Sequence, residues 1–223
     1  MAKIDFKEKL TSENDILAAE LRKQFGEDDL FALNLVSSPG SGKTSLLERT
    51  LSELGSQLEM GLIAGDVQTE NDADRLIRAG GKMVRPIVTN GACHLDAKMI
   101  TRVLSSFKLR ALDVLFIENV GNLVCPSSFD LGEDMKVVLI STTEGDDKPL
   151  KYPAMFRRSS LMIINKIDLL GHSDFDLERV KKHARQINGE IEIIELSCRT
   201  KEGLDDWFSW LKENVRHKQS MPA

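Results

Sequence analysis

The chain of 223 residues has few cysteines, few aromatic side chains and no long apolar run. Its three cysteines are an odd number, and the segment Met1–Asp5 lacks the apolar core of a secretory signal. Both features argue against a disulfide framework and leave reduced thiols available for a metal ion. No stretch approaches the ~20 apolar residues that cross a bilayer. We therefore expect a cytoplasmic protein that does not associate with membranes.

An excess of positive charge is also missing. The 30 Lys and Arg residues are outnumbered by 35 Asp and Glu residues, which gives a net charge of −5. Basic residues occur only as scattered pairs, so the chain lacks the basic patch typical of nucleic-acid binding. Proteins and small ligands are the expected partners.

Short apolar segments alternate with amphipathic ones along the chain, a pattern typical of an α/β fold. Seven extended segments are predicted: 31–36, 60–64, 83–88, 114–117, 137–141, 161–164 and 191–196. Alternation of this kind indicates a mostly parallel, doubly wound sheet flanked by helices, in which ligands bind outside the carboxyl ends of the strands.

The sequence divides into three parts: an N-terminal helical segment at 1–30, a P-loop domain at 31–216 and a flexible tail at 217–223. Ser12 and Asp15 have capping-box spacing and predict that the first helix spans 12–25. Its apolar residues fall on one stripe: Ile16, Leu17 and Leu21. This stripe packs on the domain or docks a partner protein.

The most informative segment runs from Ser37 to Thr44 and follows the first apolar strand. It ends in Gly42-Lys43-Thr44, which is typical of a phosphate-binding loop that leads into a helix. Lys43 is placed to reach the β- and γ-phosphates, and the Thr44 hydroxyl to ligate Mg²⁺. The pattern wants glycine at position 37, where this chain has serine. The predicted phosphate-binding residues are Pro39, Gly40, Ser41, Gly42, Lys43, Thr44 and Ser45.

A second motif, Asn165-Lys166-Ile167-Asp168, follows the strand at 161–164. It is the N-K-x-D pattern of guanine binding. The Asp168 carboxylate accepts two parallel donors from guanine, N1–H and N2–H₂, which adenine does not offer. Asn165 is expected to contact another edge of the base, the Lys166 stem to cover its face, and Ser197 to lie beside the pocket. A motif this short also occurs in ordinary turns at the ends of strands. Because it lies downstream of a phosphate-binding loop in this chain, it favours GTP and GDP as ligands.

Two carboxylates follow strands at the same predicted edge, Asp66 after 60–64 and Glu118 after 114–117. Either can anchor the Mg²⁺ that bridges the nucleotide phosphates. The alternative for both residues is an ordinary, solvent-exposed acid at the end of a strand. Gly121 leaves room for its backbone N–H to approach the γ-phosphate. Lys43, Asp66 and Glu118 are therefore the candidate catalytic residues. No glutamine or arginine is placed to accelerate the reaction, so we expect slow hydrolysis of GTP to GDP and phosphate.

Cys93, His94 and Cys125 offer two thiolates and an imidazole, a set that suits Ni²⁺ or Zn²⁺. Cysteine is also a common buried small hydrophobe, as we expect for Cys198. Position favours a metal site, because Cys125 lies only four residues past Gly121, in a loop whose shape should depend on the nucleotide. Three ligands leave a four-coordinate metal incomplete, so water or a second subunit must complete it.

Taken together, the motifs closely resemble the HypB family, GTPases that assist nickel insertion into [NiFe]-hydrogenases. The resemblance covers nearly the whole chain and rests on these segments: 37–44, 65–69, 92–97, 118–126, 144–148 and 165–168. It implies a SIMIBI-like P-loop GTPase that forms a homodimer on GTP binding. It further implies a Ni or Zn site of Cys93, His94 and Cys125, a Mg²⁺ site near Thr44, Asp66 and Glu118, and work with a HypA-like zinc protein, a SlyD-like chaperone and the hydrogenase large subunit.

Lys148 matches a family lysine linked to the nucleotide-bound dimer. The N-terminus lacks the C-x-x-C-G-C motif and the histidine-rich tract of some members, so nickel storage on a tail is not expected. Three alternatives remain open. A urease-type nickel GTPase typically has a Cys-Pro-His run, which is absent here. A P-loop kinase for a small metabolite has a similar phosphate loop, and a non-catalytic metal-storage or sensor protein needs no hydrolysis.

Overall fold

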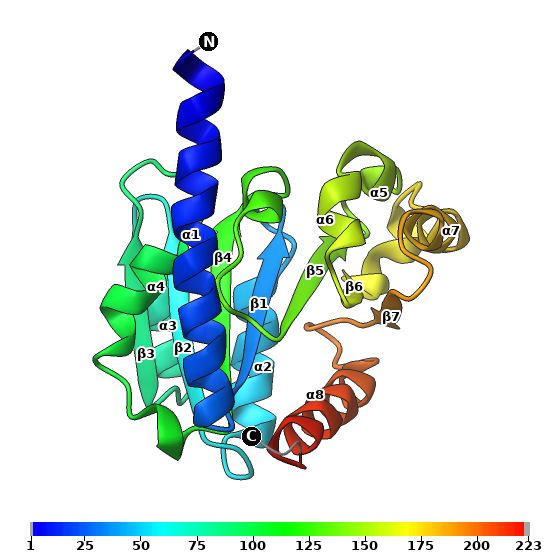
Figure 1. The fold of residues 1–223 in the computed structure, drawn as a ribbon. Helices are drawn as coiled ribbons and strands as arrows, with labels where there is room; N and C mark the ends of the chain where they lie inside the picture. The colour runs from blue at the N-terminus through cyan, green and yellow to red at the C-terminus, as the bar shows by residue number, and fades with distance from the viewer. Residues whose placement is uncertain (1, 221–223) are drawn as a thin grey trace.

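The computed structural model describes residues 2–220, with side chains described from residue 12 onward. Its centre is one seven-stranded parallel sheet with the order β3-β2-β4-β1-β5-β6-β7 (Figure 1). The strands are β1 Phe31–Ser37, β2 Met60–Asp66, β3 Met83–Val88, β4 Val114–Gly121, β5 Met135–Ser141, β6 Leu161–Asn165 and β7 Glu192–Glu195. The predicted parallel, doubly wound sheet is confirmed.

Helices connect these strands and cover both faces of the sheet. The α-helices are α1 Ala2–Glu27, α2 Lys43–Leu54, α3 Asn71–Arg78, α4 Ala97–Leu104, α5 Lys148–Lys151, α6 Pro153–Arg157, α7 Leu177–Ile187 and α8 Leu204–Ser220. Short 3₁₀ helices are η1 Leu109–Ala111, η2 Cys125–Ser128 and η3 Ile167–His172. No described helix is long and apolar enough to span a bilayer.

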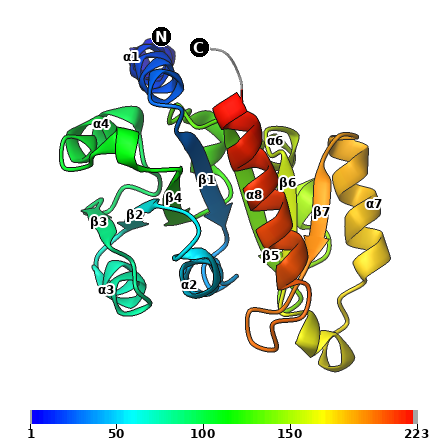
Figure 2. The same cartoon turned by 90° about the horizontal axis from the view of Figure 1, so that it is seen from below.

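Successive strand residues point to opposite faces, so each face has its own apolar core. Leu33 and Leu35 of β1 join the cluster that contains residues of α2, α3 and α8. Ala32, on the other face, packs with residues of α1 and α4, and Val36 packs with residues of α6 and α7 (Figure 2). The two helical layers hold the sheet rigid, and the loops at its carboxyl edge carry the candidate site.

The C-terminal helix behaves as its apolar spacing predicts. Leu204, Trp207, Phe208 and Leu211 are all buried in the core, and the Trp207 indole donates a hydrogen bond to Thr50 Oγ1 at 2.9 Å. Its end differs from the prediction, because 217–220 continue α8 instead of forming a flexible tail. Lys218 pairs with Asp134 at 2.6 Å and fixes this last turn, and residues 221–223 lie outside the described part of the chain.

The first helix also differs from its prediction. α1 begins at Ala2, so Ser12 lies inside the helix and does not cap it. The prediction of an apolar stripe is wrong at Ile16, which is 63% exposed. Leu21 and Phe25, in contrast, are buried against the sheet. Figure 1 shows the N-terminal part of α1 projecting past the end of the sheet. The second half of the helix is therefore anchored on the domain, which favours packing for that half.

Candidate nucleotide and metal site

The phosphate loop leaves β1 at Ser37 and enters α2 at Lys43. Gly40 and Gly42 have φ values of 77° and 104°, in the left-handed region that favours glycine. A Cβ on Gly42 would lie 2.3 Å from Asn165 Nδ2, so any side chain there would displace the loop or Asn165. The close approach of these two segments joins the phosphate loop to the predicted base-binding loop.

The serine at position 37, where the pattern has its first glycine, interacts with Lys43. Its Nζ is buried and donates to Ser37 Oγ at 2.9 Å. Burial lowers the pKa of Lys43, and the neighbouring carboxylate of Glu118 opposes that shift. A buried ammonium group at a helix N-terminus is placed to meet a phosphate. Position 37 therefore supplies an acceptor for Lys43 where the usual pattern has none.

Glu118 lies opposite Thr44 in the same cavity of about 500 Å³. The Thr44 hydroxyl donates to Glu118 Oε1 at 2.7 Å, while the buried Oε2 has no hydrogen-bond partner among the described residues. Burial raises the pKa of Glu118 to about 7, against the opposing effects of Lys43 and the Thr44 hydrogen bond. A buried carboxylate oxygen without a partner is costly, and a hard divalent cation satisfies it. These two residues fit a Mg²⁺ site.

Asp66 ends β2 and lines the same cavity. Its Oδ1 accepts the backbone N–H groups of Gln68 and Thr69 at 2.8 and 3.0 Å. Burial acts to raise the pKa of Asp66, but these hydrogen bonds outweigh it and the pKa is lowered. Asp66 is thus a charged carboxylate that shapes its own loop and faces Thr44 and Glu118 across the cavity. The expected grouping of Asp66 with Glu118 is present.

The end of β4 lies against the phosphate loop. A Cβ added to Gly121 would lie 3.1 Å from three atoms of Pro39. A side chain there would push Pro39 away by a few tenths of an ångström, so the glycine lets the loop that begins at Gly121 lie close beside the phosphate loop. Cys125 begins η2 in that same loop.

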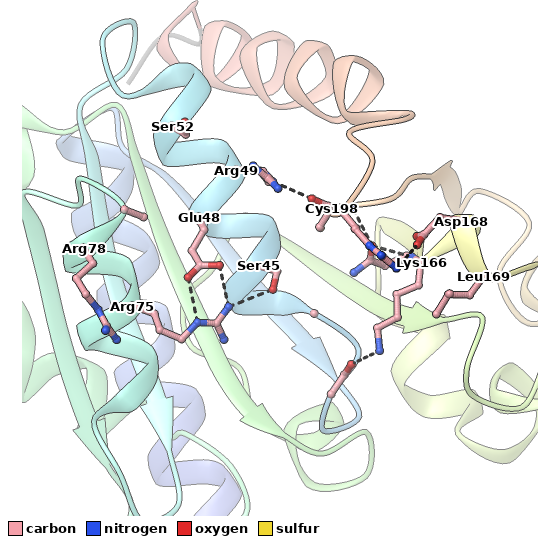
Figure 3. A pocket seen from close by; sticks show the side chains of 15 residues that line it. Ser45, Glu48, Arg49, Ser52, Arg75, Arg78, Lys166, Asp168, Leu169 and Cys198 are labelled. Carbon is pink, nitrogen blue, oxygen red and sulfur yellow. Dashed lines mark hydrogen bonds and ion pairs between the residues drawn. The ribbon is translucent and has the colours of Figure 1, made fainter.

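The base-binding motif surrounds a larger cavity of about 1040 Å³, whose lining includes Gly40, Lys166 and Asp168. Lys166 has a φ of 62° and its Nζ donates to Gly40 O at 2.7 Å, so its stem spans the cavity (Figure 3). Ser197 Oγ donates to Asp168 Oδ1 at 2.6 Å and orients that carboxylate. Lys166, Asp168 and Ser197 therefore meet as the sequence predicts.

Asn165 joins the loops on the two sides of the base cavity. Its side chain is only 2% exposed, its Nδ2 donates to Ser41 O at 2.9 Å, and its Oδ1 accepts from the backbone of Lys166 and Cys198. These contacts tie the phosphate loop to the loops on either side of the base cavity. The expectation that Asn165 contacts a base edge stays a prediction, and the structure adds that the same side chain braces the two loops.

Two residues of the 144–148 segment brace the phosphate loop, a role that sequence reasoning missed. Glu144 Oε1 accepts from Ser41 Oγ at 2.7 Å, and Lys148 Nζ donates to Ser38 Oγ at 2.7 Å. Glu144 and Lys148 also form an ion pair at 3.0 Å. Their i,i+4 spacing just after β5 was the available signal.

Cys93, His94 and Cys125 come together, although 32 residues separate the two cysteines. Their ligand atoms all lie within 4.8 Å of one another, and the two sulfur atoms are 2.7 Å apart. The neighbouring Cys125 thiol raises the pKa of Cys93, and burial lowers the pKa of His94, which favours a neutral imidazole. Neutral imidazole and thiolate sulfur are ligands for Ni²⁺ or Zn²⁺. Cys198 is buried in the core, as expected.

The fold and this site define a P-loop nucleotide-binding protein of the α/β class with a Cys/His cluster. A family model described as CobW/HypB/UreG, nucleotide-binding domain, matches residues 31–195. Hydrogenase maturation factor HypB of Azotobacter vinelandii is 52% identical over 203 residues, which cover 91% of this chain and 67% of the relative. The chain belongs to the HypB family of hydrogenase maturation factors.

Solved structures agree with this assignment. HypB from Helicobacter pylori, determined in complex with nickel, superposes with a TM-score of 0.87 and 40% identity, covering 95% of this chain and 99% of that one. The signal recognition particle receptor FtsY from Elizabethkingia anophelis shares only the fold, with a TM-score of 0.52 and 14% identity over 82% of this chain and 65% of that one. The predicted SIMIBI-like fold is therefore confirmed.

We predict that Gly42→Ala lowers GDP affinity about tenfold or more, because the added Cβ meets Asn165 and a left-handed φ is strained for alanine. Isothermal titration with GDP measures the loss. Gly171→Ala is the matched control, since no atom lies within 4 Å of its added Cβ. Equal affinity of the two variants would contradict the proposed contact between the loops.

Proposed function

We propose that this chain is a GTP-hydrolysing nickel metallochaperone for [NiFe]-hydrogenase maturation, in which the bound nucleotide controls the Cys/His site. One observation carries the proposal: Glu118 and Cys125 lie on the two ends of the same short segment. Glu118 faces Thr44 of the phosphate-loop helix, and Cys125 meets Cys93 and His94. A change at the nucleotide phosphates therefore has a short path to a metal ligand.

Guanine selectivity rests on Asp168. Its Oδ1 is oriented by Ser197, and Arg199 lies 4.0 Å from its Oδ2. A carboxylate accepts both N1–H and N2–H₂ of guanine in a charge-assisted pair, whereas adenine would leave it without donors. Lys166 covers the space beside it. These features support GTP and GDP as the nucleotides.

For hydrolysis, Lys43 would contact the β- and γ-phosphates, and Thr44 and Glu118, with Asp66 nearby, would hold Mg²⁺. Held by these residues, Mg²⁺ would supply positive charge against that of the phosphates. Arg75 lines the same cavity, but its guanidinium is paired with Glu48 at 2.8 Å (Figure 3). In this structure the Arg75 charge is directed to Glu48 and Ser45, which does not favour a role on the transferring phosphate. Slow intrinsic turnover follows, so hydrolysis acts as a timer.

The nucleotide would then switch the metal site. Binding of the γ-phosphate orders the loop after Gly121, which carries Cys125 toward or away from Cys93 and His94, and hydrolysis reverses the change. Nickel is the cargo of this cycle. Zinc is the alternative occupant of the same ligands.

Assembly follows from the incomplete ligand set. Cys93, His94 and Cys125 offer one ligand atom each, so a four-coordinate ion needs another from water or a second subunit. Val124, beside Cys125, is 58% exposed, which suits a surface that becomes covered. We propose a GTP-dependent homodimer at this face that cooperates with a HypA-like zinc protein, a SlyD-like chaperone and the hydrogenase large subunit.

The alternative functions lose support from the family assignment. Identity to hydrogenase maturation factors at about half of all positions favours that pathway over the urease-type GTPase and over a P-loop metabolite kinase. A storage or sensor protein without hydrolysis is separated by measuring GTPase activity with and without Ni²⁺.

We predict that Asp168→Asn lowers GDP affinity at least about 100-fold, because two charge-assisted hydrogen bonds are lost at about 1.5–3 kcal/mol each. The same variant should gain affinity for xanthosine diphosphate, whose ring carries a carbonyl where guanine has an amino group. Titrations with GDP, XDP and ADP measure the change. Preference of the unaltered protein for ADP would contradict guanine selectivity.

We also predict that Ni²⁺ affinity differs at least about fivefold between the GDP form and the form with a nonhydrolysable GTP analogue. Chelator competition with each form gives the two affinities. Cys125→Ala should weaken both and remove the difference, whereas Cys198→Ala, a cysteine outside the cluster, should preserve it. Equal affinities in the two forms of the unaltered protein would contradict the switch.

A further inference from the structure

Four polar side chains are buried where β4, β1 and the start of β5 adjoin. Asn34 is 0% exposed, Asn119 1%, Glu133 8% and Lys136 6%, and together they are called the polar relay. Buried polar groups are costly unless hydrogen bonds satisfy them. An apolar residue at Asn34, in the middle of β1, would be the simpler choice for packing. Packing alone therefore does not explain why these four positions are polar.

The polar relay forms a continuous chain across three neighbouring strands. Asn119 of β4 donates to Asn34 Oδ1 at 3.3 Å, and Asn34 of β1 donates to Glu133 Oε1 at 3.0 Å. Lys136 of β5 completes the chain through an ion pair with Glu133 at 3.2 Å. The register supports this path, because Asn34 pairs with Lys136 across the β1–β5 ladder.

One end of the polar relay lies beside the nucleotide site. Asn119 is the next residue after Glu118, and the alternation of β4 directs the two side chains to opposite faces of the sheet. Glu118 reaches Thr44 on one face while Asn119 reaches Asn34 on the other. Since β1 leads into the phosphate loop three residues after Asn34, two strands link the relay to the phosphates.

The polar relay also holds backbone groups next to two of the metal ligands, His94 and Cys125. Asn119 Oδ1 accepts from the N–H of Leu95, the residue after His94, at 3.2 Å. Lys136 Nζ donates to Pro126 O, one residue past Cys125, at 3.1 Å and to Phe129 O at 3.4 Å. The Phe129 ring in turn stacks on the His94 imidazole at 3.8 Å. Both loops of the metal cluster thus end on the same buried chain.

We propose that the polar relay transmits the state of the nucleotide site to the metal cluster, with Asn34 as the positioning residue at its centre. A shift of β4 at Glu118 moves Asn119, and the chain through Asn34 and Glu133 moves Lys136 together with the backbone beside Cys125. The inference rests on the proposed function, since it names the route by which nucleotide controls metal.

Asn34→Leu tests the polar relay by breaking it in the middle, while the residues on either side of Asn34 keep their other contacts. Leucine keeps the branching at Cγ, is larger, and neither donates nor accepts, so the link between Asn119 and Glu133 is broken. Lys136 retains Glu133 and both carbonyl groups, and Asn119 retains Leu95. The matched control is Thr50→Val, which removes a buried hydroxyl that bonds Leu46 and Trp207, outside the relay.

The experiment measures Ni²⁺ affinity by chelator competition for each protein with GDP and with a nonhydrolysable GTP analogue. We expect Asn34→Leu to lower the ratio of the two affinities by at least about twofold, since the Asn119–Leu95 bond and the direct segment from Glu118 to Cys125 remain, while Thr50→Val keeps the unaltered ratio. A purely structural role would weaken both affinities by the same factor and leave the ratio unchanged. That result, or equal loss of the ratio in Thr50→Val, would overturn the relay.

Failure of the proposed function is distinguishable from failure of the relay. Equal affinities in the unaltered protein overturn both, whereas a ratio that survives in Asn34→Leu overturns the relay alone. Thermal unfolding checks that each variant folds. Where Asn34→Leu does not fold, Asn34→Ala, which removes the same two hydrogen bonds without an apolar side chain of full size, is judged by the same ratio.

Discussion

The main constraint on the site is the buried carboxylate of Glu118, of which only one oxygen has a hydrogen-bond partner among the described residues. Glu118 Oε1 accepts from Thr44, but Oε2 has no hydrogen-bond partner among the described residues, and desolvation raises the pKa to about 7. Such a group costs stability until a cation meets it. Its place near the carboxyl end of the central strand β4, between the phosphate loop and the Cys125 loop, is the position from which the proposed coupling would act.

The strand order of the sheet brings Glu118 close to the other residues of the site. Strands β2, β4 and β1 are neighbours, so Asp66, Glu118 and the phosphate loop share one edge, and rigid helical layers on both faces limit how far any strand can shift without moving its contacts. Cys93 and Cys125 lie on loops at that same edge. The soft Cys/His ligand set and the hard carboxylate oxygen of Glu118 therefore lie a few residues apart and suit different ions.

Local motifs made much of this predictable. The phosphate loop, Lys166-Ile167-Asp168 and the seven strands depend on short-range geometry, and the cysteine cluster was found because its residues are chemically rare. Sequence could not reveal that Asn165 braces Ser41, because that contact joins residues 124 apart. Capping-box spacing misplaced the start of α1, since the same residues occur inside helices. Glu133 and Lys136 look like a solvated i,i+3 pair until the fold buries them.

The central claim is that occupation of the cavity beside Glu118 sets the position of Cys125. Crystal structures of the nickel-loaded protein with GDP and with Mg²⁺ and a GTP analogue test it most directly. The account predicts that Glu118 Oε2 faces the Mg²⁺ ion and that the separation of the Cys93 and Cys125 sulfur atoms differs between the two structures. Superposable Cys125 loops in both, with Glu118 turned away from the ion, would contradict it.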